Sequence, residues 1–442
     1  MNFFRNLRHR SPRPDRGLED SWYFATARGL VERESLTGDI RADVCVVGAG
    51  YTGLSAALEL AARGYRVVVL EAWRAGAGAS GRNGGVLGMG QRRDQDELEG
   101  WLGHEWARGL WNLALEANAL VRERVRRYDI DCDLVDGELH AAHRPRYLDA
   151  WNAYAGRLAR DYGYDRIRAV GRDEMVAMLG TEAYHGGYLD TGAGHLHPLN
   201  LSLGLARAAE SHGAVIYERS AVVSYQGGTR AGEPVVVRTA AGSVRADYLV
   251  LACNGYLGHL EPTLAPWQMP INNFILATAP LDPALARRIN RDNVAVVDSR
   301  FVVNYFHLSP DRRLIFGGGE NYTTRFPHDL KAFVRRRMLE IYPSLGQVTI
   351  DHAWGGTLAI TLRRMPHFGR KGHGVWWAQG YSGHGIAMAN MGGKLVAEAI
   401  MGDAERFDLL ARLPHVRFPG GTLLRWPALV AGMLYYSLLD RL

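Results

Sequence analysis

Cysteine is scarce in this chain. Its 442 residues include only three, Cys45, Cys132 and Cys253, which lie far apart and form no C-x-x-C pair. The sequence therefore predicts neither disulfide bonds nor a metal site, and it favours a reducing compartment, the cytoplasm.

Long apolar runs are absent as well. Residues 428–439 are apolar but too few to cross a bilayer. They predict a terminal helix that packs on the body of the protein or on a partner, and a homodimer is one such arrangement. The chain is long enough to bury a large core and to form two domains.

Lysine is almost missing, so the net charge of +6 comes from arginine. The charge is spread along the chain, apart from a tail with arginines at 5, 8, 10, 13 and 16. This tail has no apolar core and is not a secretory signal. A solvated end is favoured over a contact with anionic lipid or nucleic acid, and we expect no nucleic-acid partner.

The strongest motif begins at a short apolar run over residues 44–47, whose β-branched side chains predict a buried strand. A glycine-rich turn over 48–53 (GAGYTG) follows, and then a helix-compatible run over 54–63. A second strand over 66–70 ends on Glu71. This order predicts a βαβ unit.

The βαβ unit predicts a dinucleotide site. Gly48 permits the tight turn, Gly50 lets the backbone approach a pyrophosphate, and Gly53 lets helix and strand pack closely. The helix N-terminus offers N–H groups and positive potential to phosphates. Glu71 is placed to accept hydrogen bonds from ribose hydroxyls, which argues against NADP. The alternative is a glycine-rich turn in an unrelated α/β protein.

A second run of small residues follows over 73–85. It lets the backbone lie against a flat, bulky ligand, and Ser80, Arg82 and Asn83 offer hydrogen-bond donors. A flavin needs such a cradle, whereas a nicotinamide dehydrogenase has no obvious use for it. The alternative is a flexible surface loop.

The remaining chain alternates between helices and strands. One or two helices are predicted over 94–128, and further helices over 144–179 with a break near Gly163, 199–211, 329–342 and 386–401. A strand or hairpin is predicted over 131–142, and strands over 214–224, 248–252, 273–278, 301–306, 313–317 and 374–380. We expect 260–350 to form an antiparallel sheet that walls a substrate pocket. His195 and His197 are predicted to be structural rather than metal ligands.

Several of these stretches together resemble a known family. They are VVGAGYTGLSAALELAARGYRVVVLE, GASGRNGG, the strand with Val222, the LACNGY turn and GYSGHGI before the last long helix. The chain resembles the FAD-dependent amine oxidoreductases of the D-amino acid oxidase, glycine oxidase and sarcosine oxidase group. Within that group GHLHPLN and the C-terminal FPGG…RWP…GMLYYSLLDRL are most similar to the γ-glutamylputrescine oxidase branch.

The resemblance implies an α/β fold in which a Rossmann-like FAD domain of the glutathione reductase type is interleaved with an α+β substrate domain of mixed, largely antiparallel sheet. The implied division is an N-terminal tail and lead-in (1–40), FAD-binding segments (41–95, 195–258, 351–410), substrate-domain segments (96–194, 259–350) and a C-terminal tail helix (411–442).

The resemblance also implies which residues bind FAD: Gly48, Ala49, Gly50, Tyr51, Thr52, Gly53, Glu71, Ala72, Ser80, Gly81, Arg82, Asn83, Gly84, Val222, Asn254, Gly255, Gly383, His384, Gly385 and Ile386. Some relatives hold the flavin through a cysteine before the last glycine-rich strand. Residues 354–369 contain none, so we predict non-covalent FAD. An aspartate that many relatives carry in this stretch is replaced by Arg363 or Arg364.

The implied chemistry is transfer of a hydride equivalent from an amine-bearing carbon to the flavin, giving an imine that hydrolyses to an aldehyde or keto acid. The pocket candidates are Tyr256, Asn272, Tyr305, His307, Tyr381 and His384, and we nominate His384, Tyr381, Tyr305 and Tyr256 as catalytic. Arg82 or Arg300 would bind a substrate carboxylate.

The electron acceptor stays open at this point. Sarcosine oxidase-type relatives use a lysine to activate O2, and none of Lys331, Lys371 and Lys394 is an obvious candidate. The alternatives are an amino-acid dehydrogenase or a flavin subunit that passes electrons to another acceptor, and a flavoprotein linked to RNA by its basic tail.

Overall fold

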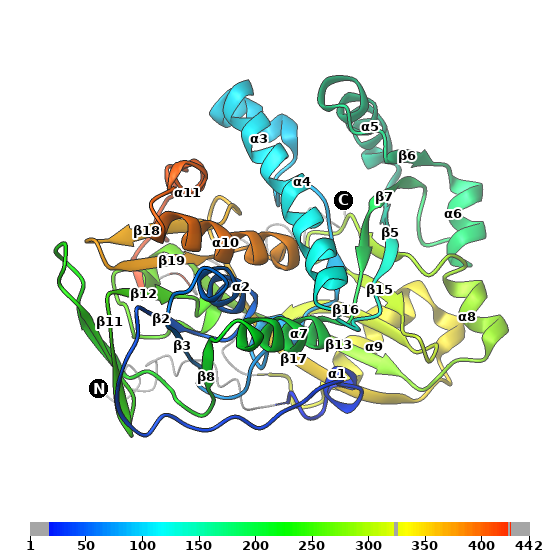
Figure 1. The fold of residues 1–442 in the computed structure, drawn as a ribbon. Coiled ribbons are helices and arrows are strands. Elements are labelled where there is room, and N and C mark those ends of the chain that lie inside the picture. The colour runs from blue at the N-terminus through cyan, green and yellow to red at the C-terminus, as the bar shows by residue number, and fades with distance from the viewer. Residues whose placement is uncertain (1–16, 322–325, 423–424, 426–442) are drawn as a thin grey trace, which may run out of the picture.

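A computed structural model describes residues 17–321, 326–422 and 425 of the chain. Figure 1 shows two main sheets, one on the left of the view and one at the centre and right, with the long helix α4 (His104–Arg127) rising between them. The basic tail and the predicted C-terminal helix lie outside the described residues.

The first sheet has six strands. Its centre is the predicted strand β2 (Val44–Val47), which pairs in parallel with β3 (Val67–Leu70) on one side and β12 (Tyr248–Leu251) on the other. The strands β8 (Val215–Tyr217), β19 (Val375–Gln379) and the antiparallel β18 (His367–Lys371) complete the order β18-β19-β12-β2-β3-β8. One face of this sheet packs on helices, and the other packs on a smaller sheet that carries Val235, Val237 and Val244. The strands β2, β3, β12 and β19 are therefore apolar and buried almost throughout, as the sequence pattern predicted.

Helices α2 (Tyr51–Ala61), α7 (Pro198–Ser211) and α10 (Gly385–Ile400) pack beside this sheet, together with α4. The contact between α2 and α10 is close, because a Cβ on Gly393 would lie 2.2 Å from the carbonyl oxygen of Thr52. The N-terminal end of α2 therefore packs on the middle of α10, and each helix follows a strand of the sheet.

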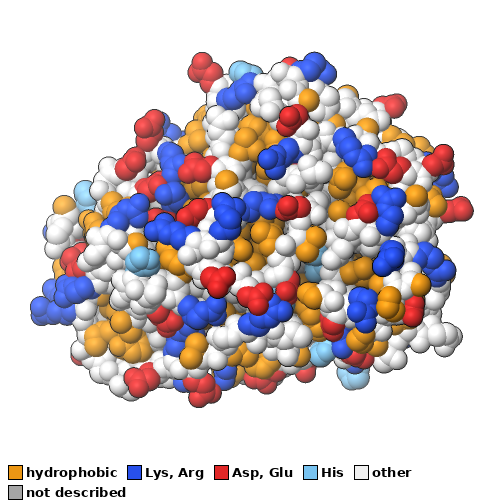
Figure 2. All heavy atoms as spheres, turned by 45° about the vertical axis from the view of Figure 1, so that its right-hand side comes forward, with side chains coloured by type: hydrophobic (Ala, Val, Ile, Leu, Met, Phe, Trp, Pro, Cys, Tyr) orange, Lys and Arg blue, Asp and Glu red, His pale blue; other side chains and the backbone are white. Residues whose placement is uncertain are grey.

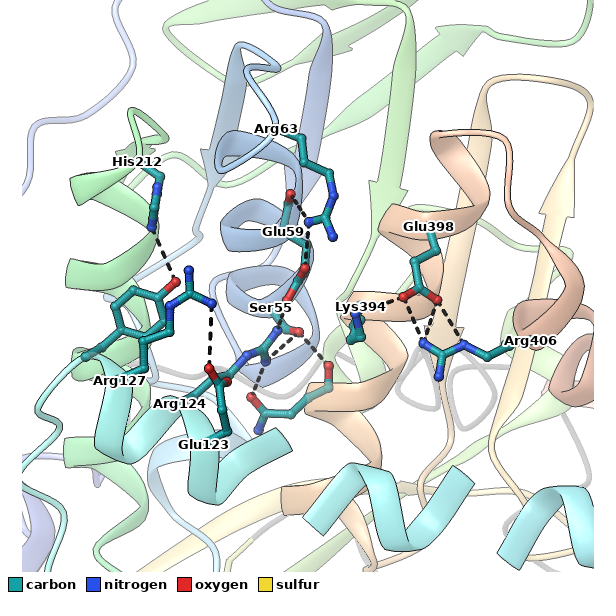
Figure 3. A network of polar contacts seen from close by, with 12 residues as sticks. Ser55, Glu59, Arg63, Glu123, Arg124, Arg127, His212, Lys394, Glu398 and Arg406 are labelled. Carbon is teal, nitrogen blue, oxygen red and sulfur yellow. Dashed lines mark hydrogen bonds and ion pairs between the residues drawn. The ribbon is translucent and has the colours of Figure 1, made fainter. Parts of the chain in front are cut away.

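A buried arginine joins three of these helices (Figure 3). Arg124 of α4 donates through Nη1 to Ser55 Oγ (2.8 Å) and Asn390 Oδ1 (3.0 Å), and through Nη2 to Glu59 Oε1 (2.8 Å). The Arg124 side chain is 2% exposed. Burial alone would raise the pKa of Glu59, but the charge and hydrogen bond of Arg124 bring it below its usual value.

The second sheet has nine strands. Its order is β17 (Ile350–Ile360), β13 (Met269–Thr278), β16 (Leu314–Asn321), β15 (Tyr305–Leu308), β14 (Ala295–Asp298), β5 (Val135–Ala141), β7 (Gly187–His195) and β4 (Val86–Leu87), with β6 (Ile167–Val170) also paired to β7. Most pairs are antiparallel and β14–β5 is parallel. One face packs on a core that includes Leu139, Phe306 and Phe316. Since side chains alternate along a strand, Glu138 and His140 lie on the opposite face.

The smaller elements complete the fold. A four-stranded sheet has the order β1 (Gly38–Arg41), β11 (Gly242–Ala246), β10 (Val235–Arg238) and β9 (Ser224–Gly227), and the remaining helices are α1 (Trp22–Ala25), α3 (Gln95–Leu102), α5 (Leu148–Tyr162), α6 (Arg172–Leu179), α8 (Pro283–Ile289), α9 (Leu330–Ile341) and α11 (Glu405–Ala411). Short 3-10 turns include η1 (Ala79–Gly81) and η3 (Asn254–Tyr256).

Three predicted elements are wrong in extent. The strand over 214–224 ends at Tyr217, because the next residues turn away and Glu218 Oε1 accepts the N–H of Ala75 (3.0 Å). The strand over 301–306 begins only at Tyr305. The run over 144–179 contains β6 after the predicted break at Gly163, where a short edge strand pairs with β7.

The surface carries charges of both signs. On the face shown in Figure 2, basic side chains lie beside acidic ones. Many arginines form ion pairs, such as Arg168 with Glu174 at 2.7 Å. Among the described residues, no helix is both long and apolar enough to span a membrane.

Candidate active site

One cavity of about 940 Å³ lies between the two sheets. It is lined by the ends of β2 and β3, the N-termini of α2 and α10, and the face of the nine-stranded sheet that carries Glu138 and His140. The nominated FAD residues that line it are Gly48, Gly50, Tyr51, Thr52, Glu71, Ala72, Ser80, Arg82, Asn83, Gly84, Val222, Asn254, Gly383, His384, Gly385 and Ile386. The nominated Ala49, Gly53, Gly81 and Gly255 lie behind them.

The glycines of the βαβ turn are sterically required. A Cβ on Gly53 would lie 1.9 Å from the carbonyl oxygen of Gly48, and a Cβ on Gly48, whose φ is +107°, would lie 2.9 Å from the carbonyl oxygen of Ala252. Neither Gly50 before α2 nor His384 before α10 caps its helix with a side chain. The N–H of Tyr51, at the start of α2, donates to Ser80 Oγ at 2.9 Å. Both helix N-termini line the cavity, an arrangement suited to anionic groups.

Glu71 lies at the end of the cavity that is lined by β3 and Val222. Its carboxylate accepts the N–H groups of Ala49 (2.8 Å) and Trp73 (2.9 Å). Burial raises the pKa of this group, and the two backbone hydrogen bonds oppose that shift. The geometry orients Glu71 at the turn, and its role toward a ribose stays a prediction.

The loop over 78–85 is held by its own side chains. Asn83 Nδ2 donates to the carbonyl oxygens of Ala79 (3.0 Å) and Ser80 (2.9 Å), and its Oδ1 accepts the N–H of Gly85 (2.9 Å). Arg82 Nε donates to the carbonyl oxygen of Ala77 at 2.7 Å. Arg82 Nη1 reaches the carbonyl oxygen of Gly355 on β17 at 3.1 Å, so this loop is fixed to the second sheet.

Tyr305 lies against this loop. A Cβ on Gly84 would lie 2.2 Å from its ring, and its hydroxyl donates to Asn273 Oδ1. Asn273 and Tyr305 line the cavity, whereas the nominated Asn272 and His307 point elsewhere. The prediction at Asn272 missed by one residue, which reverses the face of a strand.

The two other nominated tyrosines line the cavity but use their hydroxyls in the fold. Tyr381 OH is 2.7 Å from Thr52 Oγ1 in the contact between α2 and α10. Tyr256 OH accepts the N–H of Thr357 at 3.2 Å. Their catalytic roles stay predictions. The contacts show that both hydroxyls bind other residues of the fold at the edge of the cavity.

His384 remains the best placed of the nominated catalytic residues. It lines the cavity just before α10, and its Nε2 is buried with no hydrogen-bond partner among the described residues. Burial lowers the pKa of the ring, and the charge of nearby Glu138 opposes that shift. A neutral imidazole with an unsatisfied buried nitrogen suits contact with a ligand.

The sequence reasoning missed four residues on β5 and β7, which we call the β5–β7 patch: Glu138, His140, Tyr188 and Asp190. All four line the cavity. Glu138 and Asp190 are 5% exposed, and Glu138 Oε1 lies 3.2 Å from His140 Nε2. Burial would raise the pKa of Glu138 and lower that of His140, but their mutual attraction reverses both shifts. Each group therefore favours the charged form of the other.

Three arginines also line the cavity: Arg92, Arg300 and Arg364. Arg300 forms an ion pair with the buried Asp298, which also accepts the N–H of Asn304 (3.0 Å). The guanidinium of Arg364 lies 5.7 Å from the ring centre of Phe301. Of the two positions where an aspartate is replaced, Arg364 is thus the one at the cavity, since Arg363 lies over Trp101.

The histidines of the GHLHPLN stretch have partners inside the fold. His195 Nε2 contacts the carbonyl oxygen of Asn293 at 2.7 Å, and its ring stacks on His307 at 4.2 Å. His197 Nδ1 accepts the N–H of Asn200 at 3.1 Å and so caps α7. These contacts account for both side chains as structural. The described residues contain no group of three His, Cys, Asp or Glu side chains placed to hold a metal ion.

All three cysteines lie in the described part of the chain as free thiols. Cys253 alone borders the cavity, at the end where its Sγ lies 3.6 Å from the carbonyl oxygen of Val47. Burial raises its pKa to about 12, which leaves little nucleophilic thiolate. Non-covalent binding of the cofactor stays a prediction, and β17 carries no cysteine that would oppose it.

The cavity, with its glycine turn and two helix N-termini, is the site of a dinucleotide-dependent α/β enzyme. Comparison with known proteins defines it further. The family "FAD dependent oxidoreductase" (DAO) matches residues 43–399. The chain is 43% identical over 423 residues to gamma-glutamylputrescine oxidoreductase of Escherichia coli K12, covering 96% of this chain and 98% of the relative.

Two further proteins are similar to this chain in sequence or in structure. A probable oxidoreductase, OrdL of Rhizobium meliloti, is 42% identical over 95% of this chain and 97% of its own length. The crystal structure of glycine oxidase from Geobacillus kaustophilus superimposes with a TM-score of 0.68 at 24% identity, over 82% of this chain and 95% of that chain. The protein belongs to the FAD-dependent oxidoreductase family that contains these enzymes, so the predicted fold class and cofactor are confirmed.

The residues present fit FAD. Side chains at Gly48, Gly53 or Gly84 would collide with Ala252, Gly48 or Tyr305, so glycine is needed to keep the backbone of the cradle in this conformation. The unsatisfied Nε2 of His384 belongs to another residue that lines the cavity. Val222, the N-terminus of α2 and Tyr305 all line this one cavity of about 940 Å³. The individual contacts of the nominated residues stay predictions.

Proposed function

We propose that the enzyme oxidises a primary or secondary amine to an imine, which hydrolyses to an aldehyde or keto acid and ammonia or an amine. The proposed substrate is a polyamine derivative such as γ-glutamylputrescine, with an amino acid as the broader class. The observation that carries this proposal is the cavity between the two sheets, which joins a flavin cradle to a chamber of buried acidic, basic and aromatic side chains. The 43% identity to the Escherichia coli enzyme supports the polyamine derivative.

Bound FAD supplies the two-electron oxidant. The chain has to present the amine as a free base, hold its C–H bond in line, and exclude water. On β17 the residues at alternate positions Gly356, Leu358 and Ile360 line the cavity. This wall is apolar, and apolar surroundings favour the neutral form of an amine. We assign the reacting nitrogen to this part of the cavity.

A carboxylate on the substrate requires a cation. Arg300, oriented by Asp298, and Arg364 both line the cavity and fit that role. The nominated Arg82 is bound to the carbonyl oxygens of Ala77 and Gly355 and is better suited to holding the cradle.

The electron acceptor is O2 in the first proposal, and another acceptor in the alternative. One observation supports an acceptor other than O2. All three lysines lie in the described part of the chain, and none of them lines the cavity. Lys371 pairs with Glu261 at 2.9 Å and Lys394 with Glu398 at 2.9 Å, while Lys331 binds the carbonyl oxygen of Asp351 at 2.9 Å. His140, charged through its pairing with Glu138, is a cation in the cavity that would serve an oxidase.

The experiment is a turnover assay on the purified holoenzyme with γ-glutamylputrescine, putrescine, N-methyl amino acids and free amino acids. We expect γ-glutamylputrescine to give an aldehyde and ammonia in equal amounts, with consumption of O2 and formation of H2O2. Reduction of an artificial dye without H2O2 formation would select the dehydrogenase alternative. Absence of turnover with every amine, under both acceptors, would contradict the proposal.

Four other expectations belong to the proposal. These are the division into FAD and substrate segments, the individual contacts to FAD, a homodimer, and a cytoplasmic location. The three free thiols suit a reducing compartment, which supports the last of them.

A further inference from the structure

The β5–β7 patch places two carboxylates side by side. Glu138 and Asp190 are direct partners in the antiparallel register of β5 and β7. His140 and Tyr188, two positions further along the strands, are also direct partners. Side chains of directly opposed residues lie on the same face, about 5 Å apart at Cβ. The rings of His140 and Tyr188 stack with centres 4.3 Å apart, and Trp151 lies edge-on to Tyr188 at 5.4 Å.

Each carboxylate has one oxygen that is bound and one that is open. Asp190 Oδ1 accepts Tyr164 OH (2.5 Å) and the N–H of Gly192 (2.8 Å). Glu138 Oε1 contacts His140. Asp190 Oδ2 and Glu138 Oε2 have no partner among the described residues, although both residues line the cavity. Like charges that face each other across two strands destabilise a sheet, and burial increases that cost.

The charge of the patch is not balanced from within. Two carboxyl groups, of Glu138 and Asp190, stand beside the single imidazole of His140, while Asp94 and Arg92, one acid and one base, also line the cavity. Burial raises the pKa of Asp190, and the hydrogen bond from Tyr164 opposes that shift. Trp151 also lines the cavity, and its aromatic ring adds further preference for a cation. A primary ammonium group, with three N–H donors, matches the open oxygens.

We propose that the β5–β7 patch binds a second ammonium group of the substrate, one that is not oxidised. The proposal rests on the proposed amine oxidation and narrows its substrates to molecules that carry another ammonium group away from the reacting nitrogen. Carboxylates favour the charged form of an amine, whereas the reacting nitrogen must be neutral. The patch is therefore unsuited to the reacting amine, which the apolar wall of β17 accommodates.

The first test measures binding to the holoenzyme by calorimetry with tert-butylammonium chloride. This primary ammonium cannot be oxidised, because its amine-bearing carbon has no hydrogen, and tert-butanol is its neutral isostere. We expect the ammonium to bind at least about 10-fold more tightly than the alcohol. Asp190→Asn keeps an oxygen to accept the bonds from Tyr164 and Gly192 but removes the charge, so we expect it to abolish most of this preference.

Two other variants check the assignment. Asp136→Asn is the matched control, because Asp136 also lies on β5 but pairs with Arg122 and has a 69% exposed side chain, and we expect unchanged binding. Glu138→Gln also removes the reason for His140 to stay charged, so we expect a smaller loss, about threefold. Circular dichroism and flavin content verify the fold of each variant. If Asp190→Asn does not fold, the loss of ammonium preference in Glu138→Gln tests the proposal instead.

The second test is kinetic and uses γ-glutamylputrescine beside its analogue without the α-amino group. For Asp190→Asn we expect KM for γ-glutamylputrescine to rise about 10- to 100-fold with kcat nearly unchanged, and KM for the analogue to stay the same. Equal loss with both compounds, or a fall in kcat alone, would overturn the inference. If the wild type binds tert-butylammonium no more tightly than tert-butanol, the inference of an ammonium site is overturned, whether or not amines are turned over. If tert-butylammonium is preferred but no amine is turned over, the result counts only against the proposed amine oxidation.

Discussion

Gly53→Ala is expected to yield a protein without FAD. The new Cβ would lie 1.9 Å from the carbonyl oxygen of Gly48 and 3.1 Å from Val46 Cγ1, so either α2 or the glycine turn has to move. Both elements line the cofactor end of the cavity. We expect FAD affinity to fall by at least about 1,000-fold, and the measurement is flavin absorption after purification and after incubation with excess FAD.

The matched control is Gly100→Ala in α3, where a Cβ meets nothing within 4 Å. Alanine is the better helix former by about 1 kcal/mol, so local propensity predicts that both substitutions stabilise the protein. The steric argument predicts opposite outcomes, with flavin retained in Gly100→Ala and lost in Gly53→Ala. Full flavin content in Gly53→Ala would contradict the assignment of the glycine turn.

Arg124→Met is expected to lower the free energy of unfolding by about 3 kcal/mol. The substitution removes three charged hydrogen bonds, to Ser55, Asn390 and Glu59, and leaves the Glu59 carboxylate with less compensation in a largely buried place. Denaturant unfolding of the holoenzyme measures the change. Because α2 and α10 both meet Arg124, we also expect weaker FAD retention.

Arg127→Met is the control for this prediction. Arg127 lies on the same helix, but its side chain is 61% exposed and its partner Glu123 is 3.6 Å away, so we expect a loss of less than about 1 kcal/mol. Adding Glu59→Gln to Arg124→Met should recover part of the loss, since the unpaired carboxylate is then removed. An Arg124→Met protein as stable as Arg127→Met would show that the buried ion pair contributes nothing.

The pKa of Glu59 determines how the contribution of the Arg124–Glu59 pair to stability changes with pH. Its pKa is lowered in the folded protein, so the pair stabilises the fold above the pKa of the unfolded chain, and this contribution is lost as the pH falls through the lowered folded value. The stability gap between wild type and Arg124→Met should therefore narrow in acid.

The cofactor end of the site was predictable because the residues that define it lie close together in the sequence. A strand, three glycines, a helix and an acid lie within residues 44–71, and the structure places them as β2, α2 and β3 with Glu71 at the turn. Gly48 and Gly53 are needed for contacts with near neighbours in the chain or in the same sheet, whereas a Cβ on Gly50 would lie 2.8 Å from Ser80 Oγ in the following loop. The helices α3 and α4 followed equally from their amphipathic pattern.

The chamber beyond the flavin cradle was not predictable in the same way. Glu138 and Asp190 are 52 positions apart in the sequence and meet only through the register of β5 and β7. Nothing in the sequence around either acid marks it, since an isolated acid in a strand is usually solvated. The strand predicted over 301–306 failed for a related reason, because Asp298 binds the N–H groups of Arg300 (3.2 Å) and Asn304 (3.0 Å) and holds that segment as a loop.

The most direct test of the account is an anaerobic titration of the purified yellow protein with γ-glutamylputrescine. The account predicts that the visible flavin absorption is lost on addition of this amine and is unaffected by NADH. Bleaching by NADH with no response to any amine would contradict amine oxidation and leave only the fold. A colourless protein that cannot be reconstituted with FAD would contradict the central claim itself.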